Sequence, residues 1–377
     1  MYGRQGNFRK LFDIDKEMWN IYIAAGEPPY LRIRFFSIWD WIAAGRYAEY
    51  EKEYRIVRET ARSLQDQEYS CMKTRDLGFC LGFQGKCSEA LAMVEESLSL
   101  ARSLGKAGEP DVFFGLSVYG TVCLKCGKLD KAEEYLSQAL TAGHRLHAHL
   151  HGPPFHLATV YETLKNFEKA EHFYQFTRAE THLLDRHYYE CGALTGLVRV
   201  KHAWNGYTAI PSLWTEAEHL AQQYEYNDHL TSLYLTRGQI TWDGHIPDWE
   251  SGFDSALHYF QHALIHALRY NRFLLDEALS GPEQGTPLRP IIPYCLERGE
   301  EGQQMLIALH DWWQSGSNDI GISRPDTISP IPEGTALLEA ERIAREREPG
   351  DGSRQKEVVE QINAALTMAN GGERLSP

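Results

Sequence analysis

The feature that most constrains the fold of this chain is a repeat of about forty residues. Similar short turns recur at intervals of 38 to 42 residues, beginning at Gly6, Gly45, Gly85, Gly127 and Lys165. Each of these turns follows a stretch with helical spacing and opens another one. A fixed period of this length is typical of proteins that stack one helix pair on the next. We therefore predict an all-α solenoid of helix-turn-helix repeats.

Small residues recur at fixed distances from the turns. Gly78 and Gly120 each lie seven residues before a turn glycine. After three of the turns, an alanine is followed four residues later by a larger residue: the pairs are Ala90 with Val94, Ala132 with Leu136, and Ala170 with Tyr174. We expect the small residues to let two helices approach closely and the larger ones to fill the next gap. The turn glycines supply the backbone freedom that an antiparallel pair needs.

This pattern resembles that of the tetratricopeptide (TPR) family, L-G-x2-Y followed by A-x3-F. The matching positions are Gly78 and Gly120 for the first-helix glycine, Tyr161 for the tyrosine, and Ala170-x3-Tyr174 and Ala256-x3-Phe260 for the second half. The period is nearer forty than the family's value of about 34, most units lack the first-helix Trp, and the terminal Pro is absent. The resemblance is therefore to longer, degenerate TPR-like arrays, and it covers roughly residues 1–270.

The resemblance implies a right-handed α-solenoid of TPR-like helix-turn-helix repeats with a C-terminal helical cap. The repeat fades after about Leu275, where several prolines interrupt any helix. We predict two domains: a TPR-like repeat solenoid over 1–272, and a C-terminal helical extension or cap with Pro-rich loops over 273–377. A cap would cover the open end of the array; the alternative is a lid that folds back into the superhelix.

The opening segment MYGRQGNFRKLF matches the end of a first helix, a turn and the start of a second helix. We therefore expect the chain to be part of a longer protein, the alternative being a naturally short first helix. The forty-residue period and the charged segment LLEAERIAREREPGDGS also resemble the sensor region of bacterial STAND signalling ATPases. That resemblance implies a role in signalling, beside a nucleotide-binding module that this sequence does not contain.

Charge and composition exclude several classes of partner. The formal net charge of -14 argues against binding to nucleic acids, which requires clustered Lys and Arg, and against docking on an anionic membrane. No stretch approaches the ~20 apolar residues of a membrane span, and the N-terminus has no apolar signal core. Seven cysteines do not suggest a disulfide framework, so we expect a reducing, cytoplasmic location.

Motifs that carry chemistry are absent or weak. The sequence has no G-x-x-x-x-G-K-[ST], H-E-x-x-H or G-x-S-x-G motif, so we predict neither an enzyme nor a bound cofactor. Cys123 and Cys126 form a C-x-x-C pair, which we interpret as core packing within a first helix. Histidines recur in the segment 144–156 and at His258, His262 and His266. Metal binding is an open alternative there, and we favour surface or packing roles.

The residues of each first helix line the concave surface and contact ligands in TPR domains, so the resemblance implies a partner-binding groove here. Carried over to this sequence, the lining residues are Phe35, Trp39, Arg75, Phe79, Phe83 and Phe114, with Phe155 at the same place in the next unit. Large aromatic residues on a solvated face suit a peptide or helix with apolar anchors. The alternative for each residue is that it points into the core.

Three hypotheses for function follow. The first is a non-catalytic scaffold or sensor that binds a protein or peptide ligand on the concave face. The second is a sensor with a small-molecule pocket inside the superhelix. The third is an enzyme with a site in the C-terminal third, where the candidate polar residues are His310, Asp311, Arg324 and Asp326.

Overall fold

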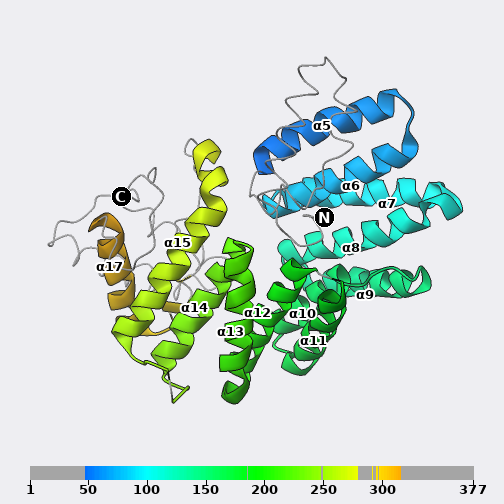
Figure 1. Cartoon of the computed structure of the whole chain (residues 1–377). Helices are drawn as coiled ribbons and strands as arrows, with labels where there is room; N and C mark the ends of the chain where they lie inside the picture. Colours follow the sequence, from blue (N-terminus) through cyan, green and yellow to red (C-terminus); the bar gives the residue numbers. More distant parts are fainter. Residues whose placement is uncertain are drawn as a thin grey trace. The chain divides into compact units, whose positions relative to one another are not determined.

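The computed structural model describes residues 47–184, 186–247, 249–278, 291, 294–295 and 297–315. Within these ranges all regular secondary structure is helical, and consecutive helices pack as neighbouring pairs (Figure 1). The prediction of an all-α solenoid is therefore confirmed for the described residues. The turns predicted at Gly6 and Gly45, and most of the predicted extension 273–377, lie outside these ranges.

The chain divides into two compact units between Tyr226 and Asn227. The predicted boundary at 272/273 lies within α15 (Phe253–Ala278), and the division of the chain at that point stays a prediction. Among the described helices of the first unit, the first helices of the repeats are α6 (Gln67–Phe83), α8 (Glu109–Lys125), α10 (Gly152–Thr163) and α12 (His187–Ala203). The second helices are α5 (Tyr47–Ser63), α7 (Cys87–Ser103), α9 (Leu129–Arg145), α11 (Phe167–Leu183) and α13 (Ile210–Gln223). Short 3-10 helices, η1 (Gly105–Gly108) and η2 (Tyr207–Ala209), precede α8 and α13.

Each of these four first helices contacts the second helix of its own repeat, and α6, α8 and α10 also contact the first helix of the next repeat. Contacts run from α6 to α8, from α8 to α10 and from α10 to α12. The four first helices therefore form a continuous row within this unit. First helices are also buried over most of their length, as α6 and α12 show, because they pack against neighbours on several sides.

A left-handed residue follows nearly every described helix of the first unit. Between Gln65 and Lys165 these residues occur at intervals of 18 to 22 positions. Gly85 and Gly127, which the sequence predicts as turn residues, have φ angles of 74° and 71°. One residue later, a backbone N–H donates to the carbonyl five positions back, as Lys86 does to Leu81 at 3.0 Å. This bond is typical of the Schellman motif, in which a left-handed residue ends the helix.

The predicted contact between small and large residues is confirmed within the helix pairs. A Cβ added to Gly78 would lie 2.5 Å from Val94 Cγ2, and one added to Gly120 would lie 2.5 Å from Leu136 Cγ. Val94 and Leu136 are completely buried. The absence of a Cβ on the first helix therefore provides the space that the larger side chain of the second helix occupies.

The second unit contains α14 (Asn227–Asp243), α15 and α17 (Gly299–Ser315) among its described helices. Its α14–α15 pair repeats the same contact, because a Cβ on Gly238 would lie 2.5 Å from Phe260 Cε1. The Trp242 ring lies 6.0 Å from Phe260, and its Nε1 donates to Glu301 of α17 at 2.8 Å. The A-x3-F match at Ala256 and Phe260 is thus a buried packing site.

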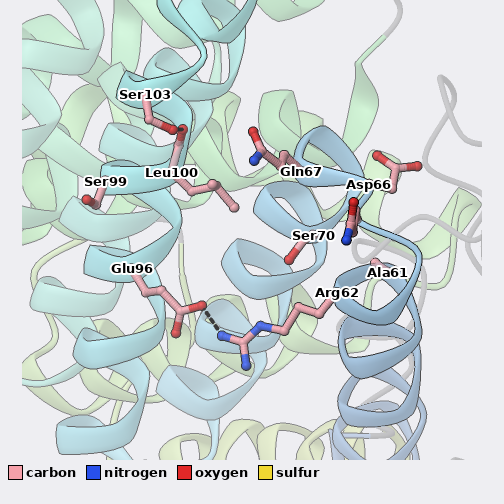
Figure 2. Close-up of a pocket in the computed structure, with 10 residues that line it drawn as sticks. Ala61, Arg62, Asp66, Gln67, Ser70, Glu96, Ser99, Leu100 and Ser103 are labelled. Carbon is pink, nitrogen blue, oxygen red and sulfur yellow. Dashed lines mark hydrogen bonds and ion pairs between the residues drawn. The ribbon is translucent and has the colours of Figure 1, made fainter.

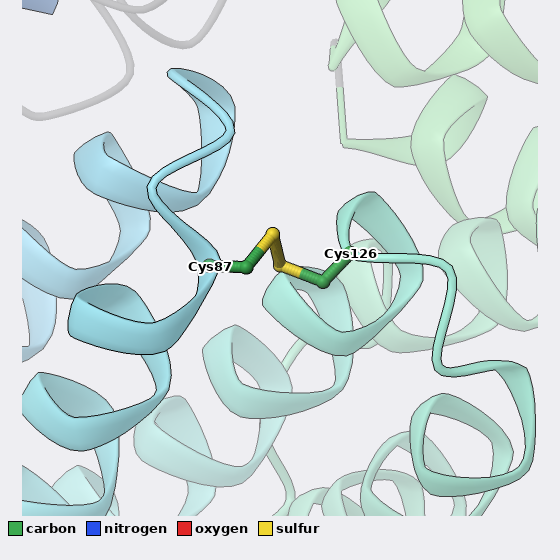
Figure 3. The surroundings of a disulfide bond; sticks show 2 residues. All are labelled: Cys87 and Cys126. Carbon is green, nitrogen blue, oxygen red and sulfur yellow. A yellow bond between two sulfur atoms is a disulfide. The ribbon is translucent and has the colours of Figure 1, made fainter. Parts of the chain in front are cut away.

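One disulfide joins consecutive repeats and corrects the interpretation of Cys126 as a core-packing residue. Cys126, at the C-cap of α8, is bonded to Cys87, the first residue of α7, with their Cα atoms 5.8 Å apart (Figure 3). Cys123 is completely buried, in agreement with the packing interpretation for that residue. The two bonded residues lie 39 positions apart, about one repeat, so stacking brings the two turns together. No helix in the described ranges is long and apolar enough to cross a membrane.

The close approach at Gly120 gives a first prediction. We expect Gly120→Ala to lower the free energy of unfolding by about 1 to 3 kcal/mol, because the new methyl group overlaps Leu136 and its backbone N. The matched control is Gly152→Ala, whose Cβ would have no atom nearer than 3.7 Å. Urea unfolding of both variants measures the difference. Equal stabilities would contradict the proposed role of this contact.

The left-handed turns give a second prediction. Lys165 has a φ angle of 58° at the position that Gly85 and Gly127 occupy in other repeats. A residue with a Cβ pays about 1 kcal/mol in this conformation, so Lys165→Gly should raise the free energy of unfolding by about that amount. Gly127→Ala should lower it by a similar amount. If thermal unfolding shows the opposite signs, backbone conformation does not limit stability at these turns.

Candidate binding surface on the first helices

An exposed phenylalanine marks the row of first helices. Phe114 of α8 is 51% exposed, although most large apolar residues of the described helices are buried. The Arg75 guanidinium carbon of α6 lies 5.4 Å from the centre of the Phe114 ring, and Arg75 Nη1 lies 3.3 Å from Asp111 Oδ1 of α8. These contacts place an aromatic ring and an ion pair side by side on α6 and α8.

The same row continues over α10 and α12. Gly152 begins α10, and a Cβ there would lie 3.7 Å from Ser117 Oγ of α8 and 3.9 Å from the Tyr189 hydroxyl of α12. The Tyr189 ring lies 4.8 Å from the ring of His151 and 5.5 Å from that of Phe155. Ser117, His151 and Phe155 remain partly exposed, whereas Tyr189 is buried beside them. We call the set of residues over these four helices the first-helix surface: Arg75, Asp111, Phe114, Ser117, His151, Phe155 and Tyr189.

The basic side chains on and beside this surface are paired with acidic side chains, so their charges nearly cancel. Burial opposes the charge of Arg75, but the carboxylates of Asp76 and Asp111 outweigh it and raise the arginine pKa. Burial raises the pKa of the Asp111 carboxyl, and Arg75 acts against that shift. Asp76 also lies 3.5 Å from Lys73 Nζ. Arg75 is thus fixed in place beside the Phe114 ring, where a guanidinium can contact carbonyl or carboxylate groups of a ligand.

Two histidines near the start of α10 have ring nitrogens without hydrogen-bond partners. His151 Nδ1 and His156 Nε2 are both buried, and neither finds a partner. Burial lowers the pKa of His151 to about 4 and that of His156 to about 3, and nearby cationic groups add to the effect. Both imidazoles are therefore neutral at physiological pH. Because these two nitrogens are buried, neither is open to a ligand in solution.

The structure separates the six residues predicted for the groove. Arg75 and Phe114 come together on the first-helix surface. Phe83 is partly exposed, with Lys125 Nζ 4.7 Å from its ring centre. Phe79 is only 1% exposed, so it is a core residue and has no surface to offer a partner. Phe35 and Trp39 lie outside the described residues.

Sequence reasoning missed four residues of the surface: Asp111, Ser117, His151 and Tyr189. Ser117 could have been found, because it lies three positions after Phe114 and so shares its helix face. Tyr189 could have been found by extending the repeat register to α12. His151 precedes α10 as its N-cap residue, and it was grouped only with the other histidines of the segment 144–156.

A polar pocket lies elsewhere in the first unit, between α5, α6 and α7 (Figure 2). Its volume is about 640 Å³. Most of its lining residues are polar, including Ser70, Ser99 and Ser103, and Arg62 pairs with Glu96 across it. Small-molecule sites have volumes in this range but are mostly apolar. The pocket therefore resembles a hydrated groove between ion-paired helices more than a typical ligand cavity.

No group of three or more His, Cys, Asp or Glu residues suited to a metal ion occurs in the part of the chain that the structure describes. His258 and His262 do share a face of α15, with ring centres 4.6 Å apart. His266, next on that face, bonds through Nδ1 to Asn227 at 2.9 Å. The enzyme hypothesis names four residues whose side chains the structure does not describe: His310 and Asp311, which lie in α17, and Arg324 and Asp326, which lie outside the described ranges.

Comparison with known proteins finds 34 matching chains among the solved structures. No protein-family model and no curated protein matches the chain. The crystal structure of BtubC (BKLC) from P. vanneervenii is similar, with a TM-score of 0.45 and 16% sequence identity. The match covers 64% of this chain and 94% of that chain. A similarity at this level says nothing about function.

The buried histidines give a third prediction. The folded-state pKa of His156 lies well below 6.5, so only the unfolded chain takes up its proton as the pH falls from 6.5 toward 3. The associated stability is complete above pH 6.5 and is lost below it, by about 1.4 kcal/mol per pH unit for one such histidine. We expect His156→Gln to show a shallower fall in unfolding free energy between pH 6.5 and 4.5. Parallel pH profiles of wild type and variant, measured by urea unfolding, would contradict this.

Proposed function

We propose that this chain is a non-catalytic binding scaffold, which holds a protein or peptide ligand on the first-helix surface. The observation that carries the proposal is Phe114, which exposes half of an apolar ring beside a guanidinium fixed by ion pairs. Apolar anchors of a peptide bind such rings, and neighbouring polar groups set its orientation. Phe155 extends the aromatic part of the surface onto α10, where its ring packs against the buried ring of Tyr189 of α12.

The net charge of the chain favours some classes of ligand over others. A net charge of -14 favours a segment that is basic or neutral and carries apolar side chains. It disfavours nucleic acids and anionic membranes for the electrostatic reasons given above. A peptide that combines an aromatic or aliphatic anchor with a basic residue fits both the Phe114 ring and the neighbouring carboxylates.

The repeat supports a more specific proposal about the class of protein to which the scaffold belongs. Helix pairs with a period near forty, and a small first-helix residue facing a large second-helix residue, are features of TPR-like arrays. Within that class, the period and the charged C-terminal segment favour a cytoplasmic sensor region of a STAND-type signalling protein. The competing small-molecule hypothesis has one supporting observation, the polar pocket of about 640 Å³ between α5, α6 and α7.

The fourth prediction tests the surface directly. Peptides selected by display against the immobilised chain should bind Phe114→Ala at least about tenfold more weakly, because truncating an aromatic anchor removes more than about 1.4 kcal/mol of binding free energy. The free energy of unfolding should change by less than about 1 kcal/mol, since half of the ring is already in water. Fluorescence anisotropy measures affinity, and urea unfolding measures stability.

Leu183→Ala is the matched control, because Leu183 is 81% exposed and lies on α11, a second helix. It should leave the affinity of the selected peptides unchanged. Equal binding by wild type and Phe114→Ala would place the ligand elsewhere. If display yields no binder while small molecules raise the melting temperature, the pocket hypothesis replaces the scaffold.

A further inference from the structure

We propose that the Cys87–Cys126 bond is a reversible thiol–disulfide exchange site, through which low-molecular-weight thiols control the junction between two repeats. The effect of that junction on ligand binding rests on the function proposed above, whereas the exchange itself does not. The bond joins the start of α7 to the end of α8 (Figure 3), and α8 carries Phe114 and Ser117.

Accessibility separates this pair from the other cysteines. Cys87 and Cys126 are partly exposed, and exposed turn residues surround them: Gly85, Lys86, Lys125, Gly127 and Lys128. The remaining five cysteines are buried thiols: Cys71, Cys80, Cys123, Cys191 and Cys295. Burial raises the pKa of Cys71, Cys80, Cys123 and Cys295. A thiol in solution can therefore reach the disulfide without opening the core, while the buried thiols stay protonated and shielded.

The local sequence favours one direction of exchange. Cys87 is the first residue of α7, where the backbone N–H groups of the helix stabilise a negative charge. Cys126 lies instead at the C-cap of α8, the end of a helix that does not favour a negative charge. Cys87 is therefore the better leaving group, and an incoming thiolate attacks the sulfur of Cys126.

The exchange balances as two steps. In the first, the incoming thiolate forms a mixed disulfide with Cys126, the bond between the two cysteines breaks, and Cys87 leaves as a thiolate that takes a proton from water. In the second, another thiolate attacks the incoming sulfur of that mixed disulfide and releases Cys126, which is also protonated. Two small thiols are oxidised to one disulfide, and the protein gains two electrons and two protons.

Apart from the backbone that runs from α7 into α8, loss of the bond removes the only covalent link between these repeats in the described residues. The α7–α8 junction is then held by side-chain packing, such as Leu98 against Gly115, where an added Cβ would lie 2.7 Å from Leu98 Cδ2. Gly127 follows Cys126 in a left-handed turn with no atom within 4 Å of a Cβ position, so the end of α8 has room to open. Reduction should therefore loosen the end of α8 first and leave the cores of the helix pairs intact.

The first test counts reactive thiols in the wild-type chain. Native protein is equilibrated in buffers of reduced and oxidised glutathione, alkylated, and mapped by mass spectrometry. We expect Cys87 and Cys126 to be alkylated together in reducing buffer and protected again after return to oxidising buffer, while the five buried thiols react only in denaturant. If the bond survives reduced glutathione until the chain unfolds, or if all seven cysteines become reactive together, the proposal is overturned.

The second test follows the junction by hydrogen exchange. Amides near residues 121–128 should exchange faster in reduced than in oxidised wild type, and Cys87→Ser should match the reduced form in both buffers. Cys123→Ala is the control, because this neighbouring thiol is not bonded and the redox response should persist. Equal exchange in oxidised and reduced wild type would overturn the control of the junction.

Both measurements need no ligand, so they remain informative if peptide selection fails. If the disulfide proves reversible but no peptide binder is found, the proposed function is refuted and the proposal of an exchange site stands. If selected peptides bind, their affinity for wild type should differ between oxidised and reduced protein, and Cys87→Ser should remove that difference. Identical affinities in the two buffers would overturn the coupling to the first-helix surface.

Discussion

Much of this structure depends on one contact, in which a residue without a side chain faces a large one inside three of the described helix pairs. Gly78 faces Val94, Gly120 faces Leu136, and Gly238 faces Phe260. The missing Cβ brings the two helices close together, and the large side chain fixes how far along its partner each helix lies. That spacing sets the direction in which each first helix leaves its pair. The alignment of α6, α8, α10 and α12 into one surface follows from it.

Ion pairs between consecutive repeats refine this arrangement without supplying most of its stability. Arg58 pairs with Glu96 at 2.8 Å, and Arg178 pairs with Glu216 at 2.7 Å. Each pair spans 38 residues, which is close to one repeat. The side chains of Arg178 and Glu216 are more than a third exposed, and exposed pairs contribute at most about 1 kcal/mol. Their regular spacing suits a role in the register of neighbouring second helices, while apolar burial supplies the larger part of the free energy.

Local signals in the sequence were sufficient to predict the fold, but they were not sufficient to predict which side chains lie on the first-helix surface. The turns at Gly85 and Gly127 could be predicted because glycine marks a left-handed residue, whereas Gln65 and Glu225 adopt the same conformation without such a mark. Phe79 and Phe114 were both assigned to the groove, yet one is buried and the other half exposed. That distinction depends on which helices lie on either side. The bond of Cys126 to Cys87 was not predicted either, because a contact between turns of different repeats appears only once the repeats are stacked.

The Schellman motifs also have a consequence for how such a chain folds during synthesis. Each motif is closed by backbone bonds between residues at most five positions apart, as between Lys86 and Leu81, so the signal that ends a helix is complete as soon as a few further residues have emerged from the ribosome. Each helix pair then requires only about forty residues of chain. Low sequence separation between contacting residues favours rapid folding, and arrays of this kind can grow one repeat at a time from a nucleus anywhere along the chain. Translation would thus add finished repeats to a growing template, with little unpaired apolar surface exposed at any moment.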